Sequence, residues 1–229
     1  MSKTLYDYDV RPLKCGRKDY WDQVRRTING KPIPPDQITI MNNLIIQELN
    51  FNSQDNLLDL CCGNGRLGVE FFAQIASYLG VDQSECLIDI AKTDFSQAPD
   101  FIFICDDIIN YLKNEKNPSA YTKCLIYGSI QYLTCDELES VFEILFKRFT
   151  NIERIFISPI PDRAKADLFF REKNCPDLDD NTAATGRWIE RNNFKNILEN
   201  IGYYCEIKNL PENHYQYESR FSALLTSRS

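Results

Sequence analysis

The chain has 229 residues, of which 43% are hydrophobic, so it can bury the core of one full domain. A single histidine and nine cysteines without any Cys-x-x-Cys pair argue against zinc or another metal site and favour reduced thiols. A formal net charge of −7 argues against a broad nucleic-acid-binding surface. No apolar stretch reaches the roughly 20 residues of a membrane span, and the N-terminal residues lack the apolar core of a secretory signal. We therefore expect a cytoplasmic protein that binds neither nucleic acid nor membrane.

The chain divides by composition into a short N-terminal segment and a long alternating region. Residues 1–35 are polar, aromatic and rich in turn signals, and Pro35 suits the first turn of a helix. From there to residue 229, apolar strand-like runs alternate with helical patterns. We therefore expect an N-terminal segment, 1–35, and one domain, 36–229.

The alternating pattern predicts an α/β fold with a parallel sheet covered by helices on both faces. The final connection, about 208–218, is too short for another helix, so the last strand must pair antiparallel with its neighbour. The prediction is a doubly wound, seven-stranded, mostly parallel sheet with an antiparallel last strand. The expected strands are 56–61, 77–82, 101–105, 123–127, 154–158, 202–207 and 220–226. The expected helices are 36–50, 65–77, 84–94, 107–113, 133–149 and 186–200.

One stretch, 161–185, does not fit the alternation. It is too polar for a core and too long for an ordinary connection. We expect it to form an insertion or a lid loop.

The most informative stretch runs from Leu57 to Gly68. A short apolar run typical of a buried parallel strand ends in Gly63-Asn64-Gly65, where the missing Cβ atoms allow a sharp turn and close approach of a ligand. A helical pattern follows. In a doubly wound sheet, a strand followed by a glycine-containing turn and a helix forms a nucleotide-binding site.

A carboxylate at the end of the next expected strand supports this interpretation. Asp82 follows Gly63 by 19 residues (82 − 63), close to the interval at which dinucleotide folds place an acid on the ribose hydroxyls. A carboxylate only accepts hydrogen bonds, which suits a diol. We expect Asp82, and Gln83 beside it, to contact a nucleoside.

Over roughly residues 36–226 the chain resembles the class I S-adenosylmethionine-dependent methyltransferases. In that family the first strand ends in an acidic residue, a small residue and then Gly-x-Gly, which here are Asp59, Cys61, Gly63 and Gly65. The family most often has glycine where this chain has Cys61. The resemblance implies S-adenosylmethionine as cofactor, with Asp59 interacting with its ammonium group.

The resemblance also assigns residues after the later strands. It implies that Asp106 accepts from the adenine amino group, that the amide of Asp107 donates to the ring, and that Ile108 packs on its face. The transferred methyl group is expected near the stretch that begins at Gly128. Segment 1–35 is expected to act as a lid over the acceptor. The substrate-binding residues implied in these two regions are Tyr20, Trp21, Ser129 and Tyr132.

A general base is required only where the acceptor must lose a proton. His214, the sole histidine, lies in the last connection, where it is a candidate base and substrate contact. Asp162, after the fifth expected strand, is an equal candidate.

The expected reaction is methyl transfer to oxygen or nitrogen of a small molecule such as a metabolite, sugar or natural-product intermediate. The Asn/Asp-Pro-Pro-aromatic sequence of base-methylating enzymes is absent after the fourth expected strand, and no metal-binding cluster is recognised. Alternatives are an NAD-binding protein, a non-catalytic cofactor-binding or assembly module, and an RNA or protein methyltransferase.

Overall fold

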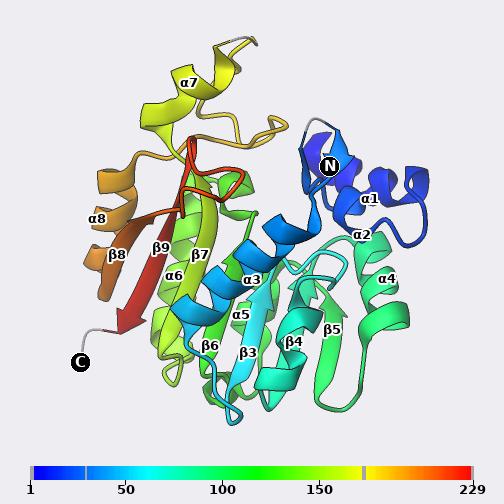
Figure 1. Cartoon of the computed structure of the whole chain (residues 1–229). Coiled ribbons are helices and arrows are strands. Elements are labelled where there is room, and N and C mark those ends of the chain that lie inside the picture. The colour runs from blue at the N-terminus through cyan, green and yellow to red at the C-terminus, as the bar shows by residue number, and fades with distance from the viewer. Residues whose placement is uncertain (1–2, 29, 172–173, 228–229) are drawn as a thin grey trace.

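The computed structural model describes residues 3–28, 30–171 and 174–227, and its centre is a single twisted sheet (Figure 1). The sheet has seven strands in the order β5-β4-β3-β6-β7-β9-β8. Their bounds are β3 Asn56–Leu60, β4 Ser77–Asp82, β5 Phe101–Cys105, β6 Lys123–Tyr127, β7 Arg154–Pro161, β8 Tyr203–Asn209 and β9 Arg220–Ser227. Strand β9 runs antiparallel to both β7 and β8, and the remaining pairs are parallel. The predicted seven-stranded α/β architecture is confirmed.

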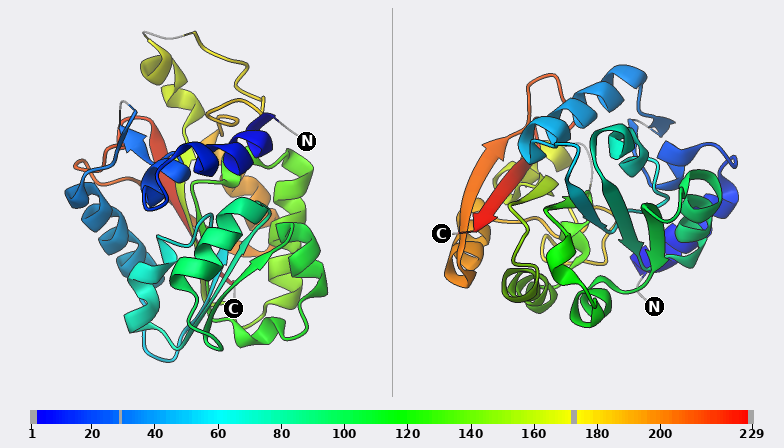
Figure 2. Two further views of the ribbon diagram at one scale, coloured as in Figure 1. Left: turned by 90° about the vertical axis from the view of Figure 1, so that its right-hand side faces the viewer. Right: turned by 90° about the horizontal axis from the view of Figure 1, so that it is seen from below.

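Two helical layers cover this sheet, one on each face (Figure 2). Helices α3 Pro35–Leu49 and α4 Glu85–Phe95 lie on one face, and α5 Ile108–Asn114, α6 Cys135–Arg148 and α8 Arg191–Ile201 lie on the other. The side chains of successive strand residues point to opposite faces of the sheet, as the two-residue period of a strand requires. In β3, Leu57 packs with α3 while Leu58 and Leu60 pack with α5 and α6.

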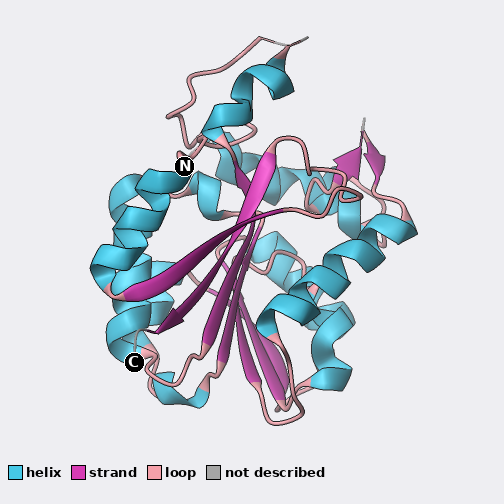
Figure 3. Cartoon of the chain, turned by 60° about the vertical axis from the view of Figure 1, so that its left-hand side comes forward, coloured by secondary structure: helices cyan, strands magenta, loops and turns pink. Residues whose placement is uncertain are grey.

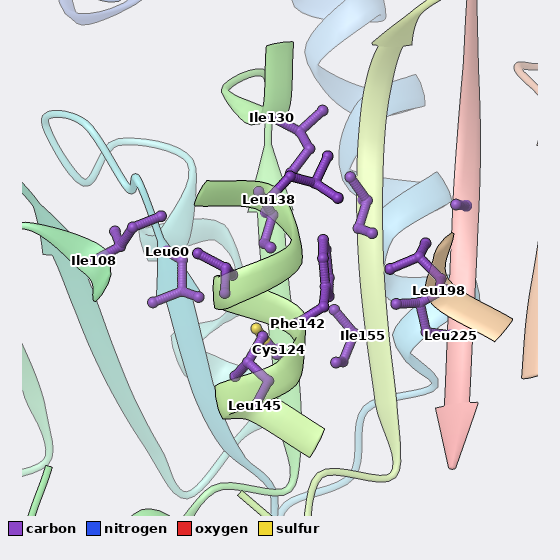
Figure 4. Packing of buried hydrophobic residues seen from close by; sticks show 14 of the residues in the cluster. Leu60, Ile108, Cys124, Ile130, Leu138, Phe142, Leu145, Ile155, Leu198 and Leu225 are labelled. Atoms are coloured by element: carbon purple, nitrogen blue, oxygen red, sulfur yellow. The ribbon is translucent and has the colours of Figure 1, made fainter. Parts of the chain in front are cut away.

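The larger of the two cores lies between the sheet and α5, α6 and α8. Figure 4 shows Phe142 and Leu145 of α6 directed at Cys124 and Ile155 of β6 and β7, with Leu198 of α8 beside them. All five side chains are at most 2% exposed. Burial of each large apolar side chain contributes about 1.5–3 kcal/mol, so this layer holds the strand ends in place.

Two expected helices differ from prediction. Residues 65–77 do not form an α-helix: a turn leads into a 3-10 helix, η1, at Gly68–Gln74. Three glycines between 63 and 68 weaken helix propensity there, and a Cβ on Gly68 would lie 2.4 Å from the Tyr78 ring. The helix expected from residue 186 begins at Arg191, because Trp188 and Ile189 are buried in an extended stretch beside β7.

The N-terminal segment contains helices α1 Lys3–Lys14 and α2 Tyr20–Gln23 and a small hairpin of β1 Thr27–Ile28 and β2 Lys31–Pro32. Helix α1 lies against α4. After β7 come the 3-10 turn η4 Arg163–Lys165 and α7 Ala166–Phe170. Figures 1 and 3 place both regions at the end of the sheet where β3, β4 and β6 terminate. None of the described helices is long and apolar enough to cross a membrane.

Candidate functional site

A cavity of about 410 Å³ lies at the carboxyl ends of β3, β4 and β6. In a doubly wound sheet this is where successive connections diverge to opposite sides and ligands bind. The N-terminal segment, residues 181–185 and residues 215–220 complete its walls. Three regions distant in sequence therefore line one space at the predicted edge of the sheet.

The turn after β3 forms one wall. Cys61 and Gly63 have φ values of 61° and 60°, a left-handed conformation that favours glycine. This accounts for the glycine that the resemblance expects at position 61. Asp82 lies directly beneath the turn: its Oδ2 accepts from the Gly63 N–H at 2.8 Å, and its Oδ1 accepts from the Ser84 N–H at 2.9 Å. Asp82 and Gln83 both line the cavity.

The second glycine of the turn has a different role. Gly65 does not line the cavity, and a Cβ there would lie 2.5 Å from the ring of Phe103. At Gly63, which does line it, the nearest atom to a Cβ would be a methyl group of Val24 at 3.0 Å. Gly63 therefore gives the ligand room, whereas Gly65 lets the turn pack against β5.

Asp59 lies behind the lining rather than in it. Its carboxylate is 2% exposed and accepts a hydrogen bond from the Tyr78 hydroxyl at 2.7 Å. Burial raises the pKa of Asp59 to about 7, because the charged form loses its hydration. Asp59 can therefore affect a bound ligand only through its electrostatic field or by positioning the turn after β3.

Three residues after β5, Asp106, Asp107 and Ile108, were predicted to bind the cofactor, and two of them line the cavity. Asp107 and Ile108 line the cavity, and Asp107 caps α5 by accepting from the N–H groups of Ile109 and Asn110, both at 3.0 Å. Asp106 is not among the lining residues. Its carboxylate instead accepts from the Asn110 side chain at 2.8 and 3.0 Å.

The end of β6 contributes Gly128, Ser129 and Tyr132, all of which line the cavity. The Tyr132 hydroxyl accepts from Tyr8 at 3.4 Å and donates to the carbonyl oxygen of Ala184 at 3.1 Å. These bonds join α1, the stretch after β6 and the segment before α8. We call the Tyr8, Tyr132 and Ala184 contact the roof of the cavity.

Neither predicted base lines the cavity. His214 is 2% exposed, its Nδ1 accepts from the Gln216 N–H at 3.1 Å, and burial lowers its pKa to about 4. Asp162 is 2% exposed and bound to Arg191, with Nε at 2.9 Å and Nη2 at 2.7 Å. The candidate base His214 is buried in a series of turns, 211–219, and does not reach the cavity.

Tyr20 and Trp21 also lie outside the lining. The Tyr20 ring packs on Phe95 and its hydroxyl donates to Asp94 at 3.0 Å, while Trp21 lies beneath the guanidinium of Arg26 at 5.7 Å. The segment does reach the cavity, but through other residues. Those residues are Tyr8, Val24, Arg25 and Arg26.

Sequence reasoning missed most of the cavity wall opposite Asp82. The arginine pair at 25 and 26 was visible as adjacent cations in a turn-rich segment, whereas Tyr127 and Tyr215 resembled ordinary strand and loop aromatics. The missed lining residues with chemically distinctive side chains are Tyr8, Arg25, Arg26, Tyr127, Gln131, Tyr215, Gln216 and Arg220.

Several buried polar atoms of this wall have no hydrogen-bond partner in the described chain. They are Arg26 Nη1, Tyr127 Oη, Gln131 Oε1, Gln216 Oε1 and Arg220 Nη1. Buried polar groups are normally paired, so their concentration around one cavity indicates a polar ligand that supplies partners. The donors suit an anionic group and the acceptors suit hydroxyl or amino groups. In the described part of the chain, no three metal-ligating side chains cluster.

Comparisons with known proteins agree with this geometry. A family model described as "Methyltransferase domain" matches residues 57–149, a range that includes the glycine turn and Asp82. A relative from Acanthamoeba polyphaga mimivirus, named "Putative RNA methyltransferase", is 26% identical over 155 residues. That alignment covers 55% of this chain and 40% of the mimivirus protein, so the chain spans less than half of the relative's length.

Solved structures resemble the whole fold. The magnesium protoporphyrin IX methyltransferase of Synechocystis, with bound S-adenosylhomocysteine, matches 99% of this chain and 100% of its own at 14% identity and a TM-score of 0.64. A TehB-like S-adenosylmethionine-dependent methyltransferase of Corynebacterium glutamicum matches 93% and 98% at 18% identity and a TM-score of 0.59. At these identities the likeness concerns the fold.

Proposed function

We propose that this chain, a class I S-adenosylmethionine-dependent methyltransferase, transfers a methyl group to an oxygen or nitrogen atom of a small molecule. The observation that carries the proposal is the cavity of about 410 Å³ over the switch point of the sheet, with unpartnered polar atoms in its wall. Cavities of this size suit small ligands. The roof joins three of the regions that line the cavity.

The residues of the cavity fit S-adenosylmethionine at one end. We propose that Asp82 accepts from the ribose hydroxyls and that Ile108 packs on the adenine ring. Gly63 and Gly128 have positive φ values and line the cavity, so the backbone approaches the ligand without a Cβ between them. The methionine carboxylate is assigned to Arg26, whose Nη1 is buried without a partner.

When bound, S-adenosylmethionine supplies a methyl group that is already activated by the sulfonium charge. The contribution of the chain is therefore mainly to position the acceptor and exclude water, and positioning alone can supply about 7–11 kcal/mol. We assign Ser129 and Tyr132 to the acceptor, because both line the cavity after β6. We assign no base to His214 or Asp162, since neither reaches the cavity.

RNA methylation is the second candidate, and the mimivirus relative is the observation that favours it. The net charge of −7 disfavours an extended phosphate-binding surface. A transfer RNA that binds the full chain in 150 mM salt would overturn the small-molecule proposal.

Calorimetric titration of the full chain with S-adenosylhomocysteine and S-adenosylmethionine tests the proposal. We expect one site per chain, with affinity lowered by about 1.5–3 kcal/mol in Arg26→Gln, which removes a charged hydrogen-bond donor. Arg66→Gln is the matched control, because Arg66 also lies over Trp21 but pairs with Glu70 and does not line the cavity. Absence of binding to either ligand would sink the proposed function.

A further inference from the structure

Arg220 is a buried cation that the cofactor assignments leave unused. It is the first residue of β9, it is 8% exposed, and it lines the cavity. Its Nη1 is buried without a hydrogen-bond partner, and within the described residues no carboxylate lies within 4.0 Å of its guanidinium. Arginine is almost never this buried unless it is paired.

The surroundings of Arg220 hold it in place without neutralising it. Its guanidinium lies over the Trp188 ring at 4.6 Å and over Phe169 at 5.4 Å. Burial lowers its pKa to about 10, and the groups that oppose this shift are the hydroxyls of Tyr132 and Tyr215 rather than a carboxylate. The side chain therefore stays positively charged at neutral pH, with an aromatic support behind it and the cavity in front.

The position of Arg220 separates it from the cofactor end of the cavity. Along the sheet, β9 is four strands from β4, so Arg220 and Asp82 lie on strands about 19 Å apart. Three strands, β3, β6 and β7, lie between them, and the ends of the first two carry the glycine turn and Gly128. A ligand group at Arg220 is therefore not the nucleoside that we assign to Asp82.

We propose that the methyl acceptor is a small organic acid whose carboxylate or phosphate group binds the guanidinium of Arg220. This inference rests on the proposed methyltransferase function. The planar guanidinium matches either oxyanion in a bidentate geometry. Its burial is tolerated because the substrate supplies the missing negative charge. The net charge of −7 disfavours a nucleic acid as the partner.

The test uses the full chain saturated with S-adenosylhomocysteine and titrated with three probes of similar shape: benzoate, phenyl phosphate and neutral benzyl alcohol. We expect at least one of the two anions to bind tenfold or more tightly than benzyl alcohol. The ratio between benzoate and phenyl phosphate then distinguishes a carboxylate substrate from a phosphate substrate. Equal binding of the anions and the alcohol would overturn the inference.

Variants assign the effect to Arg220. Arg220→Gln is expected to reduce the preference for the anion to less than threefold, with S-adenosylhomocysteine affinity within threefold of the unmodified chain. Arg220→Lys keeps the positive charge but loses the planar guanidinium that binds an oxyanion through two hydrogen bonds, so we expect an intermediate preference for the anion. The matched control is Arg163→Gln, because Arg163 is at the same end of the sheet but pairs with Asp179 outside the cavity. An unchanged preference in Arg220→Gln would also overturn the inference.

The two proposals fail in distinguishable ways. If S-adenosylhomocysteine does not bind the unmodified chain, the methyltransferase function itself fails. If it binds but the anion preference is absent, only the organic-acid substrate is rejected. If Arg220→Gln does not fold, Arg220→Lys decides the question: an anion preference equal to that of the unmodified chain would overturn the assignment to Arg220. Binding of a short RNA that Arg220→Gln abolishes, without any preference for the small anions, would replace the organic acid by a polymer.

Discussion

The carboxylate of Asp82 accepts a hydrogen bond of 2.8 Å from the backbone N–H of Gly63 and so ties the turn after β3 to the end of β4. The same carboxylate accepts from the Ser84 N–H at 2.9 Å. One side chain therefore fixes the backbone of two turns that line the cavity. Its loss is expected to affect the shape of the site as well as any direct contact with a ligand.

Asp82→Ala is expected to weaken S-adenosylhomocysteine binding by about 1–3 kcal/mol, because it leaves the Gly63 and Ser84 N–H groups without their acceptor and removes the proposed ribose contact. Calorimetry measures the change. Asp89→Ala is the control, since Asp89 is an exposed residue of α4. Equal affinities of the two variants would contradict the placement of the ribose at Asp82.

The two glycines of the turn should fail differently when substituted. Gly63→Val places a β-branched side chain toward Val24 and the cavity at a φ of 60°. We expect at least a tenfold loss of S-adenosylhomocysteine affinity, in addition to a loss of about 1–2 kcal/mol of stability from the left-handed strain. Gly65→Ala places a Cβ 2.5 Å from the Phe103 ring at a φ of 75°. Overpacking and left-handed strain together should lower the free energy of unfolding by at least about 2 kcal/mol.

Denaturant unfolding and calorimetry on both variants measure this contrast. The expected pattern is a loss of affinity in Gly63→Val, whereas Gly65→Ala loses stability and keeps its affinity. The reverse pattern would mean that Gly65, rather than Gly63, is the residue that the ligand approaches.

The sequence was sufficient to predict the sheet, because buried parallel strands are continuous apolar runs and the short final connection permits only an antiparallel pair. The positions of Asp82, Ile108 and Gly128 at the cavity were also predictable, since parallel strands end at one edge of the sheet. These features depend on local pattern and on strand direction alone.

The remainder of the site depends on long-range packing that no local pattern reports. Tyr20 and Tyr8 are both aromatic residues of the N-terminal segment, yet only Tyr8 lines the cavity, because α1 and α2 dock on α4 in a particular register. Arg220 resembles a solvent-exposed strand start in the sequence. It is buried because Trp188 and Phe169, contributed by the segment after β7, cover it.

Cys61 occupies a left-handed position, with φ of 61°, which costs a non-glycine residue about 1–2 kcal/mol. Cys61→Gly is expected to raise the free energy of unfolding by up to about 1 kcal/mol, since part of the relief is offset by the greater freedom of glycine in the unfolded chain. The adjacent Cys62→Gly removes a buried side chain with no such strain and should lower it by about 1–3 kcal/mol. The denaturant midpoints of the two variants and the unmodified chain can be compared if the denaturant dependence of unfolding is unchanged. A Cys61→Gly variant less stable than the unmodified chain would contradict backbone strain at Cys61.

Two buried groups should give stability opposite dependences on pH. Burial lowers the pKa of His214 from 6.5 to about 4, so between these values the unfolded chain binds the extra proton and stability falls as pH falls. Burial raises the pKa of Asp59 from 3.8 to about 7, so in that range the folded chain binds the extra proton and stability falls as pH rises. Each slope has an upper limit of about 1.4 kcal/mol per pH unit.

The variants His214→Asn and Asp59→Asn separate these contributions, and both retain a hydrogen-bond acceptor. The stability of the unmodified chain relative to His214→Asn should increase from pH 4 to 6.5. Relative to Asp59→Asn it should decrease from pH 4 to 7. Urea unfolding at half-unit pH intervals measures both curves, and parallel curves for the unmodified chain and a variant would show that the corresponding group is not perturbed.

The ion pair of Asp162 with Arg191 explains why a polar side chain after β7 is buried without reaching the cavity. Asp162 is 2% exposed, accepts from the Ala164 N–H at 3.2 Å and binds Arg191 of α8 through Nε and Nη2. Asp162→Asn leaves the Arg191 charge without its carboxylate, while Arg191 stays partly exposed and bonded to Asn209, so we expect the free energy of unfolding to fall by about 1–3 kcal/mol. S-adenosylhomocysteine affinity should remain within threefold, because the pair lies outside the cavity lining.

The double variant Asp162→Asn with Arg191→Gln should recover part of the loss, since the charge left unpaired is then removed. A base acting on the acceptor would give the opposite result: stability close to that of the unmodified chain, and methyl transfer that the double variant does not restore.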